Sequence, residues 1–211
     1  MDRRSWDSRL ARRLVLPLRD TWVHPNHVTT AGLLTGCVAA AAYATGTHAS
    51  WGAALYGLSA ILDHADGELA RATGRTSAFG RAYDRFSDLS IKVLVFAGMG
   101  IGLRHGGLGL LGPASGIAAG VAFVAIFLMR NAIARRRGWD ALAQPSAGGF
   151  EIEDVLYVAL PVTWLGLLAP FCVAAGVGAP TFALWVAREY RGGAEQHPRA
   201  ATNLDRPGAT E

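Results

Sequence analysis

Long runs without acidic or basic residues alternate with short charged segments along the 211-residue chain. Asp, Glu, Lys and Arg are absent from four such runs: Val28–Ala49, Trp51–Leu62, His105–Met129 and Val155–Ala187. About 20 apolar residues in a helix suffice to cross the hydrocarbon core of a bilayer. The pattern predicts six spans, at roughly 27–46, 50–70, 78–103 and 108–134, with two more in 152–189. We expect the turn between the last two at Pro170 or within Gly176–Pro180.

Composition supports a chain whose solvent is largely lipid. Residues of the AVILMFWYC set make up 51% of the sequence, and 26 glycines come in addition, which exceeds the apolar content of an ordinary soluble domain. The two cysteines, Cys37 and Cys172, lie inside apolar runs and match no metal-binding spacing. The predicted fold class is therefore an all-α integral membrane protein.

The basic residues predict the orientation of this bundle. All but two of the 20 lysines and arginines precede the first span, flank the connection between the second and third, or follow the fourth and sixth. The exceptions are Lys92 and Arg104. The positive-inside rule then places both termini on the cytoplasmic side of the cell (inner) membrane.

Three regions are expected along the chain. Residues 1–24 form a cytoplasmic arm, in which 5–19 has the arginine and apolar content of an amphipathic helix on the membrane surface, or else of a solvated arm. Residues 25–190 form the six-helix domain. Residues 191–211 are rich in Gly, Pro, Ala and charge, and we expect disorder there.

Four aspartates interrupt the apolar pattern at the cytoplasmic ends of two neighbouring spans. Asp63 and Asp66 are spaced i,i+3 on the second span, and Asp84 and Asp88 are spaced i,i+4 on the third. Each pair lies on one helix face, and the short connection makes the two helices antiparallel neighbours. Carboxylates at membrane depth are costly and usually functional. A structural ion-pair network with nearby arginines and an ion or solute transporter are the alternatives.

Four carboxylates in one small volume either protonate in part or bind cations between them. Oxygen ligands of this kind suit Mg²⁺ or Mn²⁺, and two such ions can clamp a diphosphate. Near the acids, Gly67 permits a close approach, Arg71 can pair with a phosphate, and Ser77 can donate to an anion or cap a helix.

The acids and their neighbours read D-H-A-D-G-E-L-A-R, eight residues, then G-R-A-Y-D-R-F-S-D. This resembles the signature of the CDP-alcohol phosphatidyltransferase family at all eight of its fixed positions. The stretch Pro25–Thr29 is similar to the P-N-x-x-T that opens the first span in that family.

The resemblance implies a reaction and roles for these residues. A CDP-linked donor would give its phosphate-linked group to an alcohol, with release of CMP and no nucleic acid as partner. The donor is most often CDP-diacylglycerol, but some members use a water-soluble CDP-alcohol with a lipid acceptor. Asp63, Asp66 and Asp84 would bind two metal ions, and Asp88 would contact the second ion and act as general base. Asn26, Thr29, Gly67, Arg71 and Ser77 would contact the donor. Members are typically homodimers with the site open to the cytoplasm, and a non-catalytic relative is a further alternative.

The acceptor alcohol stays open at this point. Arg130, Arg135, Arg136, Arg137 and Arg188 could serve a phosphorylated acceptor, but topology alone also requires such arginines. Lys92, one turn beyond Asp88, is expected to pair with it or to tune it. Glu151, Glu153 and Asp154 either begin a solvated helix or line the acceptor side.

Overall fold

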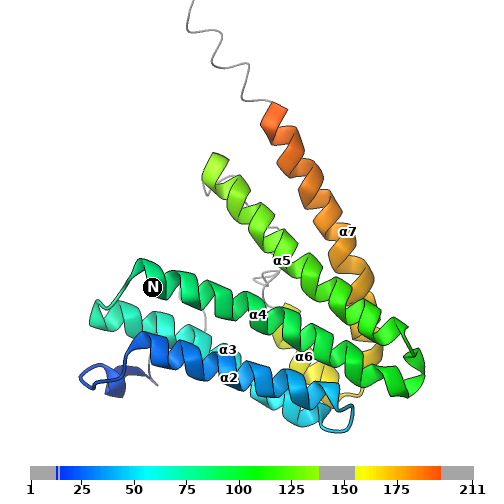
Figure 1. Ribbon diagram of the computed structural model, residues 1–211, viewed down its shortest axis with the longest axis horizontal. Helices are drawn as coiled ribbons and strands as arrows, with labels where there is room; N and C mark the ends of the chain where they lie inside the picture. Colours follow the sequence, from blue (N-terminus) through cyan, green and yellow to red (C-terminus); the bar gives the residue numbers. More distant parts are fainter. Residues whose placement is uncertain (1–12, 14, 138–154, 196–211) are drawn as a thin grey trace, which may run out of the picture.

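Helices account for almost all of the regular structure in the computed structural model, which describes residues 13, 15–137 and 155–195. A short 3-10 helix, η1, is followed by α2, α3 and α4, a π-helical turn η2, and then α5, α6 and α7 (Figure 1). Their bounds are η1 Leu16–Leu18, α2 Pro25–Ala44, α3 Ala49–Thr73, α4 Ala78–Leu103, η2 Arg104–Leu108, α5 Leu111–Arg137, α6 Val155–Trp164 and α7 Leu168–Glu195. This arrangement confirms the predicted all-α fold class.

Four of the described helices are long and apolar enough to cross a membrane. They are α2, α4 with its η2 extension, α5, and the Leu168–Arg191 part of α7. The predicted count of six spans is therefore approximate. Helix α3 has the length, at 25 residues, but its second half carries the charges of Asp63, Asp66, Glu68 and Arg71. The described part of α6 has only 10 residues.

The predicted turn within 152–189 is wrong in position. The chain turns at residues 165–167, where Gly166 has a left-handed φ of 73°. Pro170 lies in the first turn of α7, where proline costs no helical hydrogen bond, and Gly176–Pro180 lies inside the same helix.

The predicted tail also begins too early, since α7 continues to Glu195. Of the predicted arm, the structure describes residues 13 and 15–24, with the 3-10 turn Leu16–Leu18. The remainder of the predicted amphipathic helix, the acids at 151, 153 and 154, and residues 196–211 lie outside the described residues.

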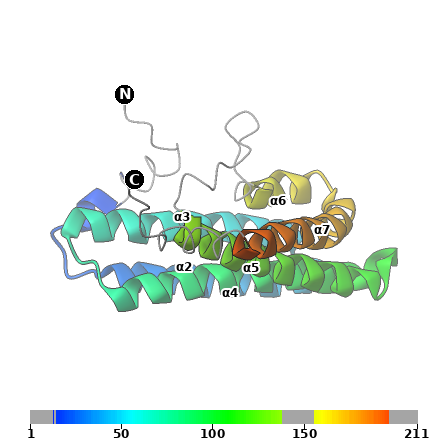
Figure 2. The ribbon, with the colours of Figure 1, turned by 90° about the horizontal axis from the view of Figure 1, so that it is seen from above.

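Small residues let α2, α4 and α5 pack with their backbones close together. A Cβ atom on Gly98 of α4 would collide with the carbonyl oxygen of Ala40 in α2, and one on Gly116 of α5 would collide with that of Phe96 in α4. Helix α3 packs along α2, and α6 covers the α3 side of the bundle (Figure 2). Helices α5 and α7 run together and diverge from α2, α3 and α4 toward their C-terminal ends (Figure 1).

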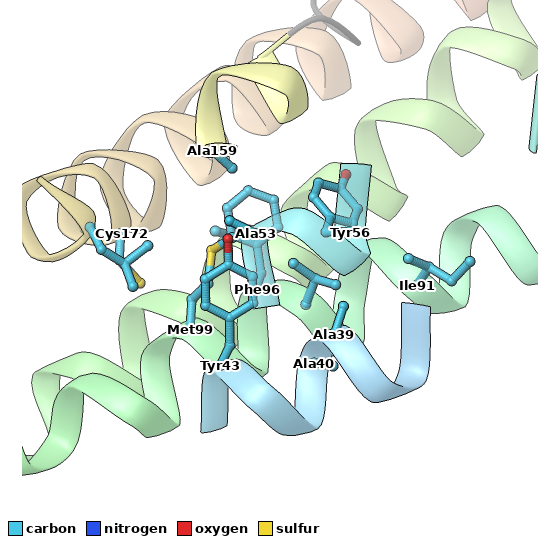
Figure 3. Close-up of a cluster of buried hydrophobic side chains, with 13 residues drawn as sticks. Ala39, Ala40, Tyr43, Ala53, Tyr56, Ile91, Phe96, Met99, Ala159 and Cys172 are labelled. Carbon is cyan, nitrogen blue, oxygen red and sulfur yellow. The ribbon is translucent and has the colours of Figure 1, made fainter. Parts of the chain in front are cut away.

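The core lies toward the end of the bundle away from the four aspartates. Tyr43, Tyr56, Phe96 and Met99 are the largest side chains of this buried cluster (Figure 3). The Thr163 hydroxyl of α6 donates to the Ala159 carbonyl, so it accepts from the Tyr43 hydroxyl, 3.0 Å away. Cys172 is buried among these residues, and both cysteines are free, as expected from the sequence.

The close helix packing predicts opposite outcomes for two glycine-to-alanine substitutions. Gly98→Ala should lower the free energy of unfolding by about 1–3 kcal/mol, because its methyl group would force α2 and α4 apart. Gly178→Ala in α7, where a Cβ meets nothing within 4 Å, should be neutral or stabilising by up to about 1 kcal/mol through helix propensity. Thermal unfolding in detergent, followed by tryptophan fluorescence, compares the two. Equal melting temperatures would contradict the packing described here.

Candidate active site

The first turn of α2 is held by two histidines and a proline. The Nδ1 atom of His24 accepts from the backbone N–H of Asn26 at 3.2 Å, and the Nδ1 atom of His27 accepts from the backbone N–H of His24 at 3.2 Å. Pro25 occupies the first helical position, where its missing N–H is not needed. This capped end fixes Asn26 and Thr29 on the turn that faces α3 and α4.

The segment before α2 anchors that turn to α3. Val15 packs with Val28, Ala65 and Leu69 in a small apolar cluster. The Arg75 guanidinium, in the connection after α3, donates to the carbonyl oxygen of Val23 at 3.2 Å. The connection between α3 and α4 is thereby tied to the entry of α2.

The start of α4 is fixed by a serine cap and by a bond to α2. The Ser77 hydroxyl accepts from the Gly80 N–H at 2.9 Å, which is the helix-capping role considered for it. The hydroxyl groups of Thr30 and Tyr83 are 3.0 Å apart and join α2 to α4. Gly74, with a left-handed φ of 68°, ends α3 and lets the chain reverse.

These three helix ends enclose a cavity of about 300 Å³. All five residues predicted to contact the donor line it, together with two of the four aspartates. The full lining is Pro25, Asn26, Thr29, Asp66, Gly67, Ala70, Arg71, Arg75, Thr76, Ser77, Gly80, Arg81 and Asp84. Asp63 lies about one turn before Asp66 on α3, and Asp88 lies about one turn after Asp84 on α4, and neither is part of this lining.

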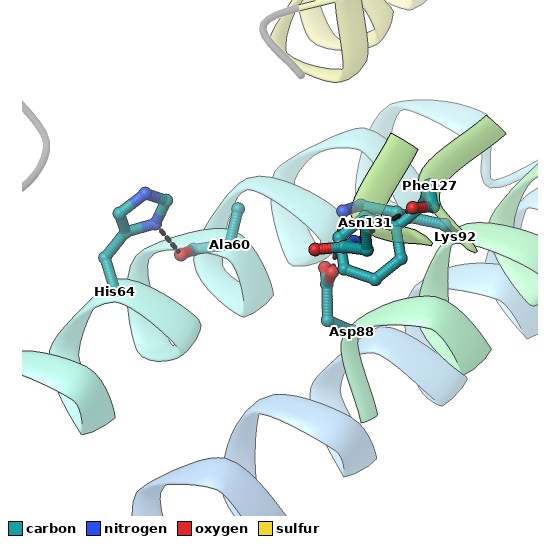
Figure 4. Close-up of polar contacts among 6 residues, drawn as sticks. All are labelled: Ala60, His64, Asp88, Lys92, Phe127 and Asn131. Carbon is teal, nitrogen blue, oxygen red and sulfur yellow. Dashed lines mark hydrogen bonds and ion pairs between the residues drawn. The ribbon is translucent and has the colours of Figure 1, made fainter. Parts of the chain in front are cut away.

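The four carboxylates are neighbours, as the spacing predicted. Asp63 lies within electrostatic range of Asp66, Asp84 and Asp88. Asp66 is buried and accepts a short hydrogen bond from the Thr29 hydroxyl. Asp88 pairs with Lys92 at 2.7 Å, which confirms the predicted pairing (Figure 4).

The four aspartates could offer carboxylate oxygens as metal ligands, and such oxygens suit a hard divalent cation. Among the residues that the structure describes, no three His, Cys, Asp or Glu side chains are arranged to hold a metal ion. Thr29 and Lys92 engage one oxygen each of Asp66 and Asp88. A cation would therefore require side-chain rotations within this cluster.

Positive groups line the same cavity as Asp66 and Asp84. The N-termini of α2 and α4 both open onto it, and each carries the partial positive charge of a helix dipole. Arg71, Arg75 and Arg81 add full charges. Arg71 also pairs with the buried Glu68 at 2.9 Å. The cavity thus offers cationic groups for a phosphate beside carboxylates for a metal ion.

Several of these contacts were missed in the sequence. Arg75, Thr76 and Arg81 line the cavity. The only sequence signal for them was their position in or beside the short connection between α3 and α4. The bond from Thr29 to Asp66 joins residues 37 positions apart, which no local pattern indicates. His64 donates from Nδ1 to the Ala60 carbonyl at 2.9 Å within α3 (Figure 4).

Most of the chain matches a known protein family. A family model described as CDP-alcohol phosphatidyltransferase matches residues 22–188, from just before α2 into α7. An archaetidylinositol phosphate synthase from Methanothermobacter thermautotrophicus is 38% identical over 104 residues, which cover 47% of this chain and 53% of the relative. The aligned part is thus about half of that curated protein.

Proposed function

The chain belongs to the CDP-alcohol phosphatidyltransferase family, and on that premise we propose that it is a membrane phosphotransferase that transfers a phosphatidyl-type group from a CDP-linked lipid to an alcohol. The observation that carries the proposal is the cavity that joins Asp66 and Asp84 to three arginines and two helix N-termini. A nucleoside diphosphate ester complexed with a divalent cation has the matching distribution of charge.

We assign the donor to this cavity. Arg71, Arg75 and Arg81 would pair with its diphosphate, and the positive end of the α4 dipole would add to the attraction. Gly67 lines the cavity without a side chain, so the diphosphate could approach the backbone there. Asn26 and Thr29 supply polar contacts from the start of α2, and Ser77 supplies one from the start of α4. CDP-diacylglycerol is the proposed donor, with its acyl chains in the bilayer.

Two divalent cations, Mg²⁺ or Mn²⁺, are the proposed cofactors. Asp63, Asp66 and Asp84 would hold them, with Asp88 contributing to the second. When bound, they would neutralise the diphosphate and stabilise the departing CMP. The convergence of four carboxylates beside the cavity supports this assignment.

Asp88 is the proposed general base. It would accept the proton of the acceptor hydroxyl as that oxygen attacks the lipid-linked phosphorus. The new oxygen–phosphorus bond forms, the bond to the CMP oxygen breaks, and CMP leaves with the electron pair. Lys92 engages Oδ2 of Asp88, so we assign the proton transfer to Oδ1.

We further propose a phosphorylated polyol of the inositol phosphate type as acceptor. The matched relative is named for a product that contains inositol phosphate. In this chain, Arg130 and Arg135 on α5 and Arg188 on α7 supply cations outside the donor cavity. Such charges would be needed to bind the phosphate of the acceptor.

Clustering of the acids at one end of α3 and α4 favours an enzyme over a transporter, which would distribute its acids along a path across the bilayer. We propose that this end faces the cytoplasmic side of the cell (inner) membrane.

A homodimer is proposed from the family resemblance. The native mass of the detergent-solubilised protein tests this proposal, and a monomeric mass would contradict it.

The direct test of the function is CMP release by the purified protein. Labelled CDP-diacylglycerol with Mg²⁺ is offered inositol phosphate, glycerol phosphate, inositol, serine and no acceptor. We expect CMP release with inositol phosphate, and its loss when EDTA exceeds the metal. CMP release that persists in excess EDTA would contradict the two-metal mechanism. No release with any acceptor would favour a non-catalytic relative or a transporter.

Substitution of two aspartates separates the proposed base from the proposed ligands. Asp88→Asn should lower CMP formation by roughly 10²–10⁴-fold, because a positioned base is worth that much, while CDP binding largely persists. Asp63→Asn should weaken Mn²⁺ and CDP binding together. The measurements are CMP release and CDP affinity at saturating Mg²⁺. Near-parental turnover in Asp88→Asn would show that the base lies elsewhere.

Orientation is tested with single cysteines in a background in which Cys37 and Cys172 are replaced. A cysteine at Arg75, before α4, should react with an impermeant maleimide only from the cytoplasmic side. One at Gly166, in the turn between α6 and α7, should react only from the opposite side. The reverse pattern of labelling would overturn the proposed orientation.

A further inference from the structure

Lys92 is the only lysine in the sequence, and the structure places it beside the carboxylate cluster. The other 19 basic residues are arginines. Its Nζ atom lies 2.7 Å from Oδ2 of Asp88, one helical turn earlier on α4. The two side chains are only 13% and 27% exposed. An ammonium group at this depth is costly unless it has a partner.

The influence of Lys92 extends beyond Asp88. Its charge also acts on Asp63 and Asp84, so three of the four carboxylates lie in its field. Lysine is a compact point charge on a flexible stem, whereas arginine presents a rigid fork. A single ammonium can therefore stand close to several carboxylates while it bonds to one.

Lys92 changes the net charge of the carboxylate cluster when cations are bound. Four carboxylates carry four negative charges, which two divalent cations would cancel completely. With Lys92 present, the same complex has one surplus positive charge, which favours the anionic diphosphate of the donor. The same ammonium repels a divalent cation and competes with it for Asp88.

We propose that Lys92 is a positioning residue that acts as a tethered cation: it holds Oδ2 of Asp88 so that this carboxylate stays available as a base, and it limits how tightly the cluster binds divalent cations. The proposal rests on the proposed function. The alternative is a purely structural role, in which Lys92 only offsets the charge of Asp88 within the bilayer. That role does not require Lys92 to limit the affinity of the cluster for divalent cations.

Two neutral variants test this, with two controls. Lys92→Met removes the charge and the hydrogen bond but keeps the length. Lys92→Gln removes the charge but keeps a hydrogen-bond donor, so it serves if the methionine variant fails to fold. Lys92→Arg keeps the charge. Arg104→Met removes one charge from an exposed position in η2, directly after the far end of α4.

The first readout is Mn²⁺ binding to the purified protein without donor, from the electron paramagnetic resonance signal of free Mn²⁺. Both neutral variants should bind Mn²⁺ on the order of tenfold more tightly, the effect of one nearby charge on a divalent ion. Lys92→Arg and Arg104→Met should bind it like the parent. The second readout is CMP release, in which Lys92→Met should lower kcat by about tenfold or more while the Mg²⁺ requirement falls to lower concentrations.

Unchanged or weaker Mn²⁺ binding in both neutral variants, with a parent that binds Mn²⁺ and releases CMP, would overturn this proposal and leave the proposed function standing. A parent that shows neither Mn²⁺ binding sensitive to Asp63→Asn nor CMP release would overturn both. Tighter Mn²⁺ binding with unchanged kcat would also overturn the positioning role.

Discussion

Mutual repulsion among four carboxylates is the constraint that organises this site. Asp63, Asp66, Asp84 and Asp88 occupy one end of two neighbouring helices, where the low dielectric strengthens every charge interaction. The Thr29 hydroxyl and the Lys92 ammonium each engage one of the four. These contacts offset part of the repulsion, and bound divalent cations would offset the rest.

The scaffold keeps the carboxylates close because its helices leave little freedom to separate. Gly98 brings the backbone of α4 against α2, and the Thr30–Tyr83 and Arg75–Val23 bonds fix the helix ends around the cavity. Helices α5 and α7 diverge from this unit toward their C-terminal ends (Figure 1). The cavity is thus built from α2, α3 and α4, whereas the arginines proposed to bind the acceptor, Arg130, Arg135 and Arg188, lie on α5 and α7.

The regular parts of this arrangement could be predicted from the sequence, and the long-range contacts could not. Helical spacing placed each aspartate pair on one face of its helix. The short connection after Thr73 predicted α3 and α4 as direct neighbours, but both helices pack mainly against α2 and contact each other little. The turn at residues 165–167 was missed, because Pro170 is tolerated in the first turn of α7 and Gly166 carries the left-handed backbone. The bonds of Thr29 to Asp66 and of Arg75 to Val23 depend on how three helix ends meet, which no local pattern encodes.

The central claim is that the four aspartates hold divalent cations directly beside a CDP diphosphate. Anomalous scattering at the manganese edge, from crystals of the protein soaked with Mn²⁺ and CDP, tests it most directly. The account predicts manganese peaks between α3 and α4, roughly 2.0–2.2 Å from oxygens of Asp63, Asp66 and Asp84, with the diphosphate against Arg71 and the start of α4. Manganese bound away from these aspartates, or CDP bound outside the cavity, would contradict it.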